Sequence, residues 1–401
     1  MNITTDKFLI LVSGVVIYLS FFLSAVLKFG AINQIDTLVF IALIFKSLFY
    51  FIFTGKIPRT GAIFFISILS FFIISSLGQN TTSLFISILS SILFVKIFLV
   101  FYALDNVKLK NLTELIHVIS LLHILGILLN IIVPDYFVAL FPSTRYELDP
   151  TRIGGFLINP NLSASVSMTL ALYNRFILQN NKLFVLFCFF IFLSASVSFF
   201  TIFILLLTYF SFIGGKNIKS IILTLFLLIA FYLFFEESIQ QRFSALDTTL
   251  NSAGQYIRVG MLLGGYKLAN DNFPFGSGGG TFGSSLSSNT SISYSQAGLS
   301  NWNSIVDSTG VFDSGIGSLI GEYGYLGLIT FIFLLLVMFK NFSSNTLRLN
   351  DYVLFVFLVI FLSFFRSVSS DFFYSIIILL NFLILIHLRE QNKFHESHIS
   401  P

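Results

Sequence analysis

Long apolar runs constrain the fold of this chain more than any other feature of its sequence. Segments of about 20 residues with few charges recur along it, and a helix of that length crosses the hydrocarbon core of a bilayer. A segment inside lipid must satisfy its own backbone hydrogen bonds, which an α-helix does internally. The sequence therefore predicts an all-α polytopic membrane protein. The predicted crossings lie near residues 8–28, 35–54, 61–77, 82–103, 112–133, 157–178, 218–235, 316–340, 350–366 and 368–388.

One further apolar run, residues 183–213, is longer than a single crossing needs. Cytoplasmic loops are enriched in Lys and Arg, so basic residues on both sides of the run predict that both of its ends are cytoplasmic. The run would then cross twice, with a hinge at the small residues 194–196. Over the whole chain this predicts about 12 transmembrane helices with both termini cytoplasmic. The flanking basic residues are Arg175, Lys182, Lys216 and Lys219.

The composition excludes several other classes of protein. Hydrophobic residues make up 56% of the chain and charged residues 10%, whereas a typical soluble domain has about 25% charged residues. A soluble globule could not cover itself with so few charges. The single cysteine, Cys188, leaves no internal disulfide and no thiolate metal site. The basic residues are spread between apolar segments and form no patch for nucleic acid.

This topology gives a single integral membrane domain, residues 1–401, with two large extracytoplasmic loops at 134–156 and 236–315. Of the seven basic residues that this topology places outside, Lys28 and Arg366 lie elsewhere and the other five lie in these two loops. Long loops translocate despite their charge, so these residues do not contradict the topology, but they need another reason to be there. They are Arg145, Arg152, Arg242, Arg258 and Lys267.

The first loop leads into a helix through residues 151–164, TRIGGFLINPNLSA. Asn159 is predicted to cap this helix, with Pro160 at the first helical position. Free backbone N–H groups and the positive end of the helix dipole would then face outward, which is an anion-binding geometry. The alternative is that Asn159 only caps a transmembrane helix and Arg152 only lies among lipid headgroups.

The second loop contains a stretch with helical periodicity, residues 255–269, followed by a glycine-rich run that begins at Pro274. The helical stretch offers an apolar face formed by Ile257, Met261, Leu262 and Leu268. The glycines at 276, 278, 279 and 280 are candidates for an anion-binding nest of successive N–H groups. A flexible surface loop is the alternative, because Gly/Ser runs usually signal flexibility.

Three blocks of the sequence together resemble the O-antigen ligase and polymerase (Wzy-like) superfamily. The segment from Arg152 to Asn161 is similar to the family's Arg-x-x-Gly-x-x-x-Asn-Pro-Asn motif. A second block of an Arg followed by a Pro and spaced glycines is matched by Arg258, Pro274, Gly276, Gly278, Gly280 and Phe282. A third block is matched by Asp313, Glu322, Gly324 and Gly327. The blocks occur in the family's order on the predicted outside loops.

The chain resembles the polymerase branch of this superfamily, because the ligase branch carries a His where this chain has Asp313. All five histidines lie outside the large outer loop. Of these, His117 and His123 fall in a predicted span, where a helix-packing role is expected. The remaining three, His387, His395 and His398, lie at the predicted cytoplasmic end.

The resemblance implies transfer of a growing glycan from a polyprenyl diphosphate carrier to a carrier-linked repeat unit. The site would lie on the extracytoplasmic face of a bacterial cytoplasmic (inner) membrane, and the product would be an O-antigen, capsule or similar glycan. The implied partners are the polyprenyl-diphosphate-linked oligosaccharide, the lipid bilayer and a chain-length regulator, with no nucleic acid.

The implied chemistry assigns roles to particular residues. Arg152 and Arg258 would stabilise the leaving diphosphate, since Arg suits bidentate phosphate recognition. Asp313, just before a span, is the candidate base, with a helix cap as its alternative. Glu322, more than two turns deeper, ranks behind it as a base or a structural partner. The candidate substrate-binding residues are Arg145, Asn159, Asn161, Arg242, Gly276, Gly278 and Gly280.

No cofactor is expected. Neither outside loop contains an Asp-x-Asp run for a divalent cation, so arginines and helix-start N–H groups would neutralise the charge. Two other functions stay open. A transporter or lipid-linked oligosaccharide flippase would show repeated halves and midplane binding residues, which the sequence lacks. The ligase activity of the same superfamily is the other alternative.

Overall fold

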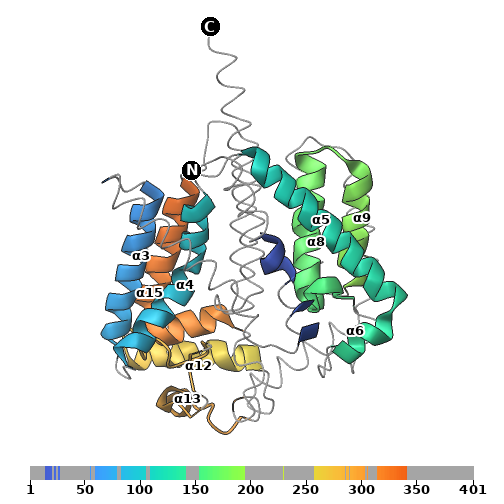
Figure 1. Ribbon diagram of the computed structural model, residues 1–401. Helices are drawn as coiled ribbons and strands as arrows, with labels where there is room; N and C mark the ends of the chain where they lie inside the picture. Colours follow the sequence, from blue (N-terminus) through green and yellow to red (C-terminus); the bar gives the residue numbers. More distant parts are fainter. Residues whose placement is uncertain are drawn as a thin grey trace. The chain divides into compact units, whose positions relative to one another are not determined.

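The computed structural model describes about half of the chain. The described residues are 14–19, 22–23, 26–27, 55, 59–78, 83–104, 109–140, 153–194, 229, 257–284, 286–288, 290–302, 305 and 314–340. Among these residues the regular elements are helices and no strand occurs, which agrees with the predicted all-α class. The chain divides into two compact units, residues 1–39 with 108–242 and residues 40–107 with 243–401 (Figure 1).

Two described helical segments, Thr113–Ile132 and Gly315–Val337, are long and apolar enough to cross a membrane. They fall within the predicted crossings near 112–133 and 316–340. The full set of about 12 crossings stays a prediction. The predicted crossings near 35–54, 350–366 and 368–388, nearly all of the one near 218–235, and the second half of the 183–213 run lie outside the described residues.

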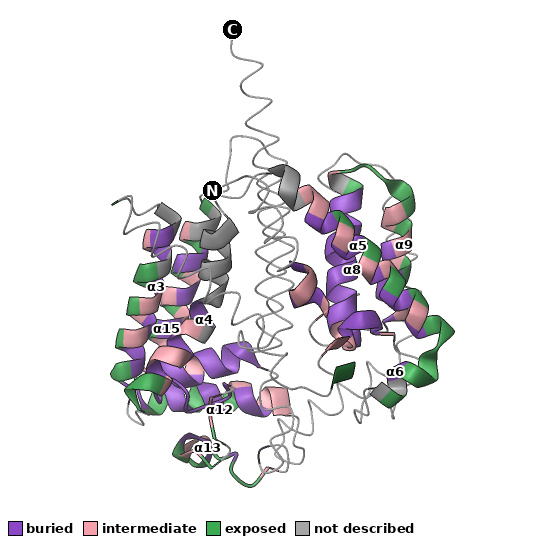
Figure 2. Ribbon diagram, viewed as in Figure 1, coloured by how far each residue is buried: buried purple, intermediate pink, exposed green. Residues whose placement is uncertain are grey.

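The first unit contains α5 (Leu109–Ile132), α6 (Pro134–Leu140), the 3₁₀ turn η2 (Gly155–Leu157), α8 (Pro160–Phe176) and α9 (Asn181–Leu193). Helix α8 is buried on every side from residue 162 to residue 174, as Figure 2 shows. Between its apolar side chains it carries four small hydroxyl residues, Ser163, Ser165, Ser167 and Thr169. Small residues let helices approach closely in a membrane, where packing drives association.

A short turn connects α8 to α9. Asn180 caps α9 by accepting a hydrogen bond from Leu183 N at 3.2 Å, and Arg175 Nη1 donates to Asn181 Oδ1. Helix α9 ends at Leu193 with Ser194 as its C-cap. This end coincides with the first residue of the predicted hinge, whose remaining residues lie outside the described part.

His123 of α5 forms a fully buried polar chain within the first unit. Its Nδ1 is 2.9 Å from the Tyr18 hydroxyl, and its Nε2 is 2.7 Å from Ser167 Oγ of α8. Both ring nitrogens therefore have partners, as buried polar groups require. The predicted helix-packing role of His123 is confirmed.

The second unit contains α3 (Arg59–Ser76), α4 (Leu84–Leu104), α12 (Ile257–Asp271), α13 (Ile292–Ala297) and α15 (Gly315–Lys340). The backbone of α15 breaks at Gly324, where φ is 63° and ψ is −162°. The second half of α15 runs beside α3 and α4, while its first half lies with α12 across one end of these helices (Figure 1).

Glycines allow α12 and α15 to touch through their backbones. A Cβ added to Gly265 would lie 2.3 Å from Gly317 O, and one added to Gly317 would lie 2.7 Å from Met261 O. Neither position has room for a side chain. The predicted helix at 255–269 is confirmed, and Met261 and Leu268 on its predicted apolar face are fully buried.

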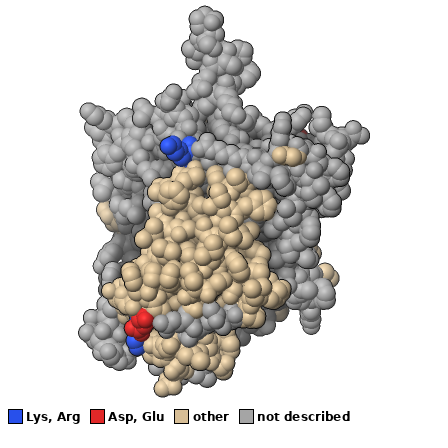
Figure 3. Space-filling model, turned by 90° about the vertical axis from the view of Figure 1, so that its left-hand side faces the viewer, with Lys and Arg blue, Asp and Glu red and all other residues tan. Residues whose placement is uncertain are grey.

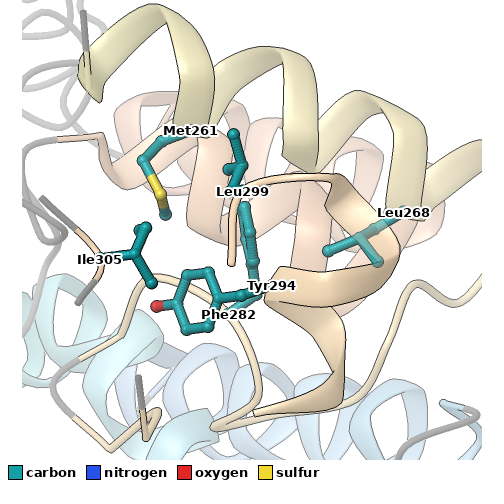
Figure 4. Close-up of a cluster of buried hydrophobic side chains, with 6 residues drawn as sticks. All are labelled: Met261, Leu268, Phe282, Tyr294, Leu299 and Ile305. Carbon is teal, nitrogen blue, oxygen red and sulfur yellow. The ribbon is translucent and has the colours of Figure 1, made fainter. Parts of the chain in front are cut away.

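A hydrophobic cluster joins α12 to the segment that contains α13. Its members are Met261, Leu268, Phe282, Tyr294, Leu299 and Ile305 (Figure 4). Within it the rings of Phe282 and Tyr294 lie 5.1 Å apart. The Tyr294 hydroxyl accepts a hydrogen bond from Gly283 N at 2.9 Å. Burial raises the pKa of Tyr294 to about 12, so its hydroxyl stays neutral near pH 7.

Candidate functional site

In the first unit, Asn130 of α5 holds the paired glycines of the first block. Its Oδ1 accepts hydrogen bonds from Gly154 N at 3.1 Å and from Gly155 N at 3.0 Å. Gly155 has a φ of 57°, and an added Cβ would lie 3.0 Å from the backbone of Gly126. Glycine is thus required there both for conformation and for contact with α5.

Asn159 caps α8, as the sequence predicts. Its Oδ1 accepts from Asn161 N at 2.9 Å and from Leu162 N at 3.4 Å, and Pro160 occupies the first helical position. The next donor, Ser163 N, bonds to Asn159 O at 3.0 Å. These bonds occupy the backbone N–H groups of Asn161, Leu162 and Ser163, and Pro160 has no N–H group. The prediction of free N–H groups at this helix start is therefore wrong, because the side chain that caps the helix occupies the place of an anion.

Several predicted residues of the two outside loops lie outside the described part of the chain. Their roles remain predictions. They are Arg145, Arg152, Arg242 and Asp313. Arg258 is described: it lies in the first turn of α12 and is partly buried. Asn161 is also described and partly buried at the start of α8.

In the second unit, the glycine-rich segment is buried from residue 276 to residue 284. Its amides are bonded to the protein: Gly276 N to Asn272 O at 3.1 Å, and Gly278 N to Glu322 O at 2.9 Å. Gly279 N donates to Ser75 Oγ of α3 at 3.0 Å. The segment is thus an ordered part of the helical packing, and the alternative of a flexible surface loop is wrong.

The polar group that this segment encloses is a side chain of the protein itself. Glu322 is fully buried; its Oε1 accepts from Phe282 N at 3.0 Å and its Oε2 from Ser90 Oγ at 2.9 Å. The acceptor that this segment encloses is thus a side chain of α15.

Glu322 joins three parts of the second unit. Ser90 on α4, which donates to Glu322, is also 2.7 Å from the Tyr323 hydroxyl. The carboxylate therefore links α4, α15 and the glycine-rich segment. The sequence placed Glu322 more than two turns deeper than Asp313 by assuming a straight helix. The break at Gly324 comes after both residues, so their separation along the helix stands, but this first half of α15 lies across one end of α3 and α4 rather than along them (Figure 1).

The break in α15 is filled by the glycine-rich segment. A Cβ on Gly324 would lie 2.2 Å from Pro274 O, and one on Gly276 would lie 2.5 Å from Gly324 N. Pro274 O accepts from Leu326 N at 3.3 Å, and Ser277 N donates to Gly321 O at 2.8 Å. Backbone groups released by the break thus find partners in the segment, as they must when buried.

Asn130, Ser75 and Ser90 were not among the residues that the sequence singled out. Each is a polar residue inside an apolar stretch, and polar residues in spans normally face the protein interior. That pattern was a usable signal for Asn130, which lies near one end of a long span. For Ser75 and Ser90 it was not, because serine is common in these helices and bonds to its own backbone. Ser67, for example, donates to Ile63 O.

Among the residues that the structure describes, no group of three or more His, Cys, Asp or Glu side chains could hold a metal ion. Comparisons of the chain with protein-family models, with curated proteins and with solved structures found no match.

Proposed function

We propose that this chain is a polysaccharide repeat-unit polymerase of the cytoplasmic membrane. It would transfer a growing glycan from polyprenyl diphosphate to the terminal sugar of an incoming carrier-linked repeat unit. One observation carries this proposal beyond the sequence. The second and third blocks of the resemblance, far apart in the chain, are directly hydrogen-bonded to each other: Ser277 N to Gly321 O at 2.8 Å and Gly278 N to Glu322 O at 2.9 Å.

This contact matters because the two blocks were selected by sequence alone. A chance match to spaced glycines in one loop and to Glu and Gly in a later helix predicts no relation between them. Blocks that build one functional region must meet in space. Here they meet through backbone atoms that only glycine allows, at Gly276 and Gly324.

The reaction forms one glycosidic bond and breaks one bond to phosphate. The acceptor hydroxyl attacks the anomeric carbon of the donor glycan, and polyprenyl diphosphate leaves. The proton of the acceptor passes to a base, for which we propose Asp313. Arg152 and Arg258 would stabilise the charge that develops on the diphosphate.

The contacts of Glu322 favour a structural role over a catalytic one. Both of its oxygens accept hydrogen bonds from the protein, and its side chain is fully buried. A base must reach the proton that it abstracts. We therefore assign Glu322 to the support of the glycine-rich segment and keep Asp313 as the base.

Glycan analysis of a deletion strain tests the proposal against its two alternatives. Loss of a polymerase leaves single repeat units attached to the final acceptor and no ladder. Loss of a ligase leaves polymer on the lipid carrier and none on the acceptor. Loss of a flippase leaves carrier-linked single units on the cytoplasmic side. Either of the last two results would overturn the polymerase assignment.

A further inference from the structure

Helix α12 has two faces of different chemistry. One face packs on α15 and the hydrophobic cluster and is formed by Gly260, Met261, Gly264, Gly265, Leu268 and Ala269. The opposite face is exposed, with Leu263 48% and Tyr266 55% accessible. Lys267, Asn270 and Asp271 are exposed beside them. Large apolar side chains and charges therefore share one exposed surface.

Aromatic rings gather where this exposed face meets α15. Tyr325 lies 6.4 Å from Tyr266 and 6.1 Å from Phe273 between ring centroids, and Phe273 is 72% exposed. The Tyr325 hydroxyl donates to Asn270 Oδ1 at 2.7 Å. Rings with an apolar body and a polar tip are enriched where a membrane meets water.

The aromatic group continues into an exposed apolar stripe along the second half of α15. Its members share one helical face and are Leu326, Ile329, Phe333 and Leu336. Figure 3 shows a broad surface of described residues without charge, with charged side chains above it and near its lower edge. Exposed apolar residues also cover α3, including Phe65, Ile66, Leu69 and Ile73.

The length of this stripe covers most of the hydrocarbon core of one bilayer. From Tyr325 to the exposed Lys340 a helix rises about 22 Å, and the hydrocarbon core is about 30 Å thick. The long Lys340 side chain can extend to the headgroups and make up part of the difference. The aromatic group at the other end then falls at the opposite interface.

We propose that α12 is an in-plane helix at the lipid–water interface, with Leu263, Tyr266 and Phe273 in contact with lipid. Lys267, Asn270 and Asp271 lie among the headgroups. The occupant of this face is the bilayer, because the face is continuous with the exposed stripe of the spanning half of α15. A protein interface would be expected to deplete charge at its centre. This inference does not depend on the proposed glycosyl transfer.

An in-plane α12 would also set the depth of the Arg258 side chain in the membrane. Arg258 lies in the first turn of the same helix, so an in-plane α12 holds this guanidinium near the level of lipid phosphates. A carrier diphosphate attached to a membrane-embedded polyprenyl chain would lie at that level.

Depth-dependent quenching of tryptophan fluorescence tests the placement. The chain has one tryptophan, Trp302, so Trp302→Phe provides a silent background. Three single-tryptophan reporters are made in this background: Tyr266→Trp on α12, Phe333→Trp within the stripe and Ser288→Trp in an exposed polar loop. The purified full-length variants are reconstituted in phosphatidylcholine vesicles brominated either near the headgroup or near the chain end. Leu263→Trp is a second reporter on the same face of α12 if Tyr266→Trp does not accumulate.

We expect lipid brominated near the headgroup to quench the Tyr266→Trp reporter more strongly than lipid brominated near the chain end. The Phe333→Trp reporter should show the reverse order. The Ser288→Trp reporter should respond to aqueous acrylamide and to neither lipid. If neither brominated lipid quenches the fluorescence of the Tyr266→Trp and Leu263→Trp reporters, the proposal is overturned. If acrylamide does not quench them either, a protein partner or a second copy covers this face. Stronger quenching of these reporters by lipid brominated near the chain end would also overturn the proposal.

Discussion

At the scale of single residues, the two arginines of the proposed reaction can be separated from ordinary headgroup anchors. Arg152→Lys and Arg258→Lys keep the charge but replace a bidentate fork by a point charge. We expect each to cost about 3 kcal/mol of transition-state stabilisation, or about a hundredfold in rate. The glycan ladder of a complemented deletion strain measures this, with membrane levels of the protein checked by blotting.

The matched control is Arg175→Lys. Arg175 is exposed at the end of α8 and contacts Asn181, and it belongs to neither outside loop in the sequence. This variant should support a normal ladder. Normal ladders with all three variants would mean that Arg152 and Arg258 act only as anchors at the membrane surface.

Asp313 and Glu322 are predicted to respond differently to replacement by the corresponding amide. Ser314 occupies the cap position of α15, since its Oγ accepts a hydrogen bond from Gly317 N at 3.2 Å. If Asp313 serves only the start of this helix, Asp313→Asn should be silent, because asparagine is as favourable as aspartate there. If Asp313 is instead the base, an amide cannot accept the proton in its place, and the expected loss of transfer rate is about a hundredfold or more. Glu322→Gln retains an oxygen for Phe282 N and an amide group for Ser90 Oγ, so we expect near-normal activity.

The measurement is again the ladder, with protein accumulation as the control for folding. Glu322→Ala should lower accumulation, because it leaves the buried Phe282 N without an acceptor at a cost of about 1–3 kcal/mol. A full ladder from Asp313→Asn together with an inactive but well-accumulated Glu322→Gln would reverse the two assignments.

Asn130 is predicted to stabilise the turn that follows Arg152. Asn130→Leu leaves the amides of Gly154 and Gly155 without their acceptor, which should cost about 1–3 kcal/mol for each buried donor. Thermal unfolding of the purified protein in detergent measures the loss. Ser120→Ala on the same helix removes a hydroxyl that bonds only to Ile116 O of its own helix, and we expect little change. Equal unfolding temperatures for the two variants would contradict the proposed role of Asn130.

At the scale of elements, the break in α15 depends on one glycine. Gly324 has φ 63° and ψ −162°, a region used almost only by glycine, and other residues pay about 1–3 kcal/mol there. A Cβ would also lie 2.2 Å from Pro274 O. Gly324→Ala should therefore displace the glycine-rich segment and lower both thermal stability and activity.

Gly298 offers a matched control for this prediction. It also has a positive φ, 79°, but an added Cβ would meet nothing within 4 Å. Gly298→Ala should cost only the conformational penalty of about 1–2 kcal/mol. If the two variants unfold at the same temperature, the contact with Pro274 contributes nothing to the break.

At the scale of the whole molecule, the topology is the premise of the proposed function. We predict that the loops at 134–156 and 236–315 are extracytoplasmic. In a Cys188→Ser background, Ser143→Cys and Ser287→Cys should react with a membrane-impermeant maleimide on intact spheroplasts. Gln179→Cys, in the turn between α8 and α9, should react only after lysis. Labelling of Ser143→Cys or Ser287→Cys only after lysis would remove the basis for the mechanism.

The sequence by itself determined the helical class, two helices long and apolar enough to cross a membrane, the cap at Asn159 and the helix predicted at 255–269. These follow from the length of apolar runs, from a side chain that bonds to its own first turn, and from periodicity, all of which are local. The partners of Glu322, the support of Gly154 and Gly155 by Asn130, and the break in α15 were decided only by the tertiary structure. Each depends on which distant segment packs where a buried donor or acceptor needs a partner. The local sequence shows that a buried donor or acceptor will need a partner, but it does not show which distant residue provides the hydrogen bond.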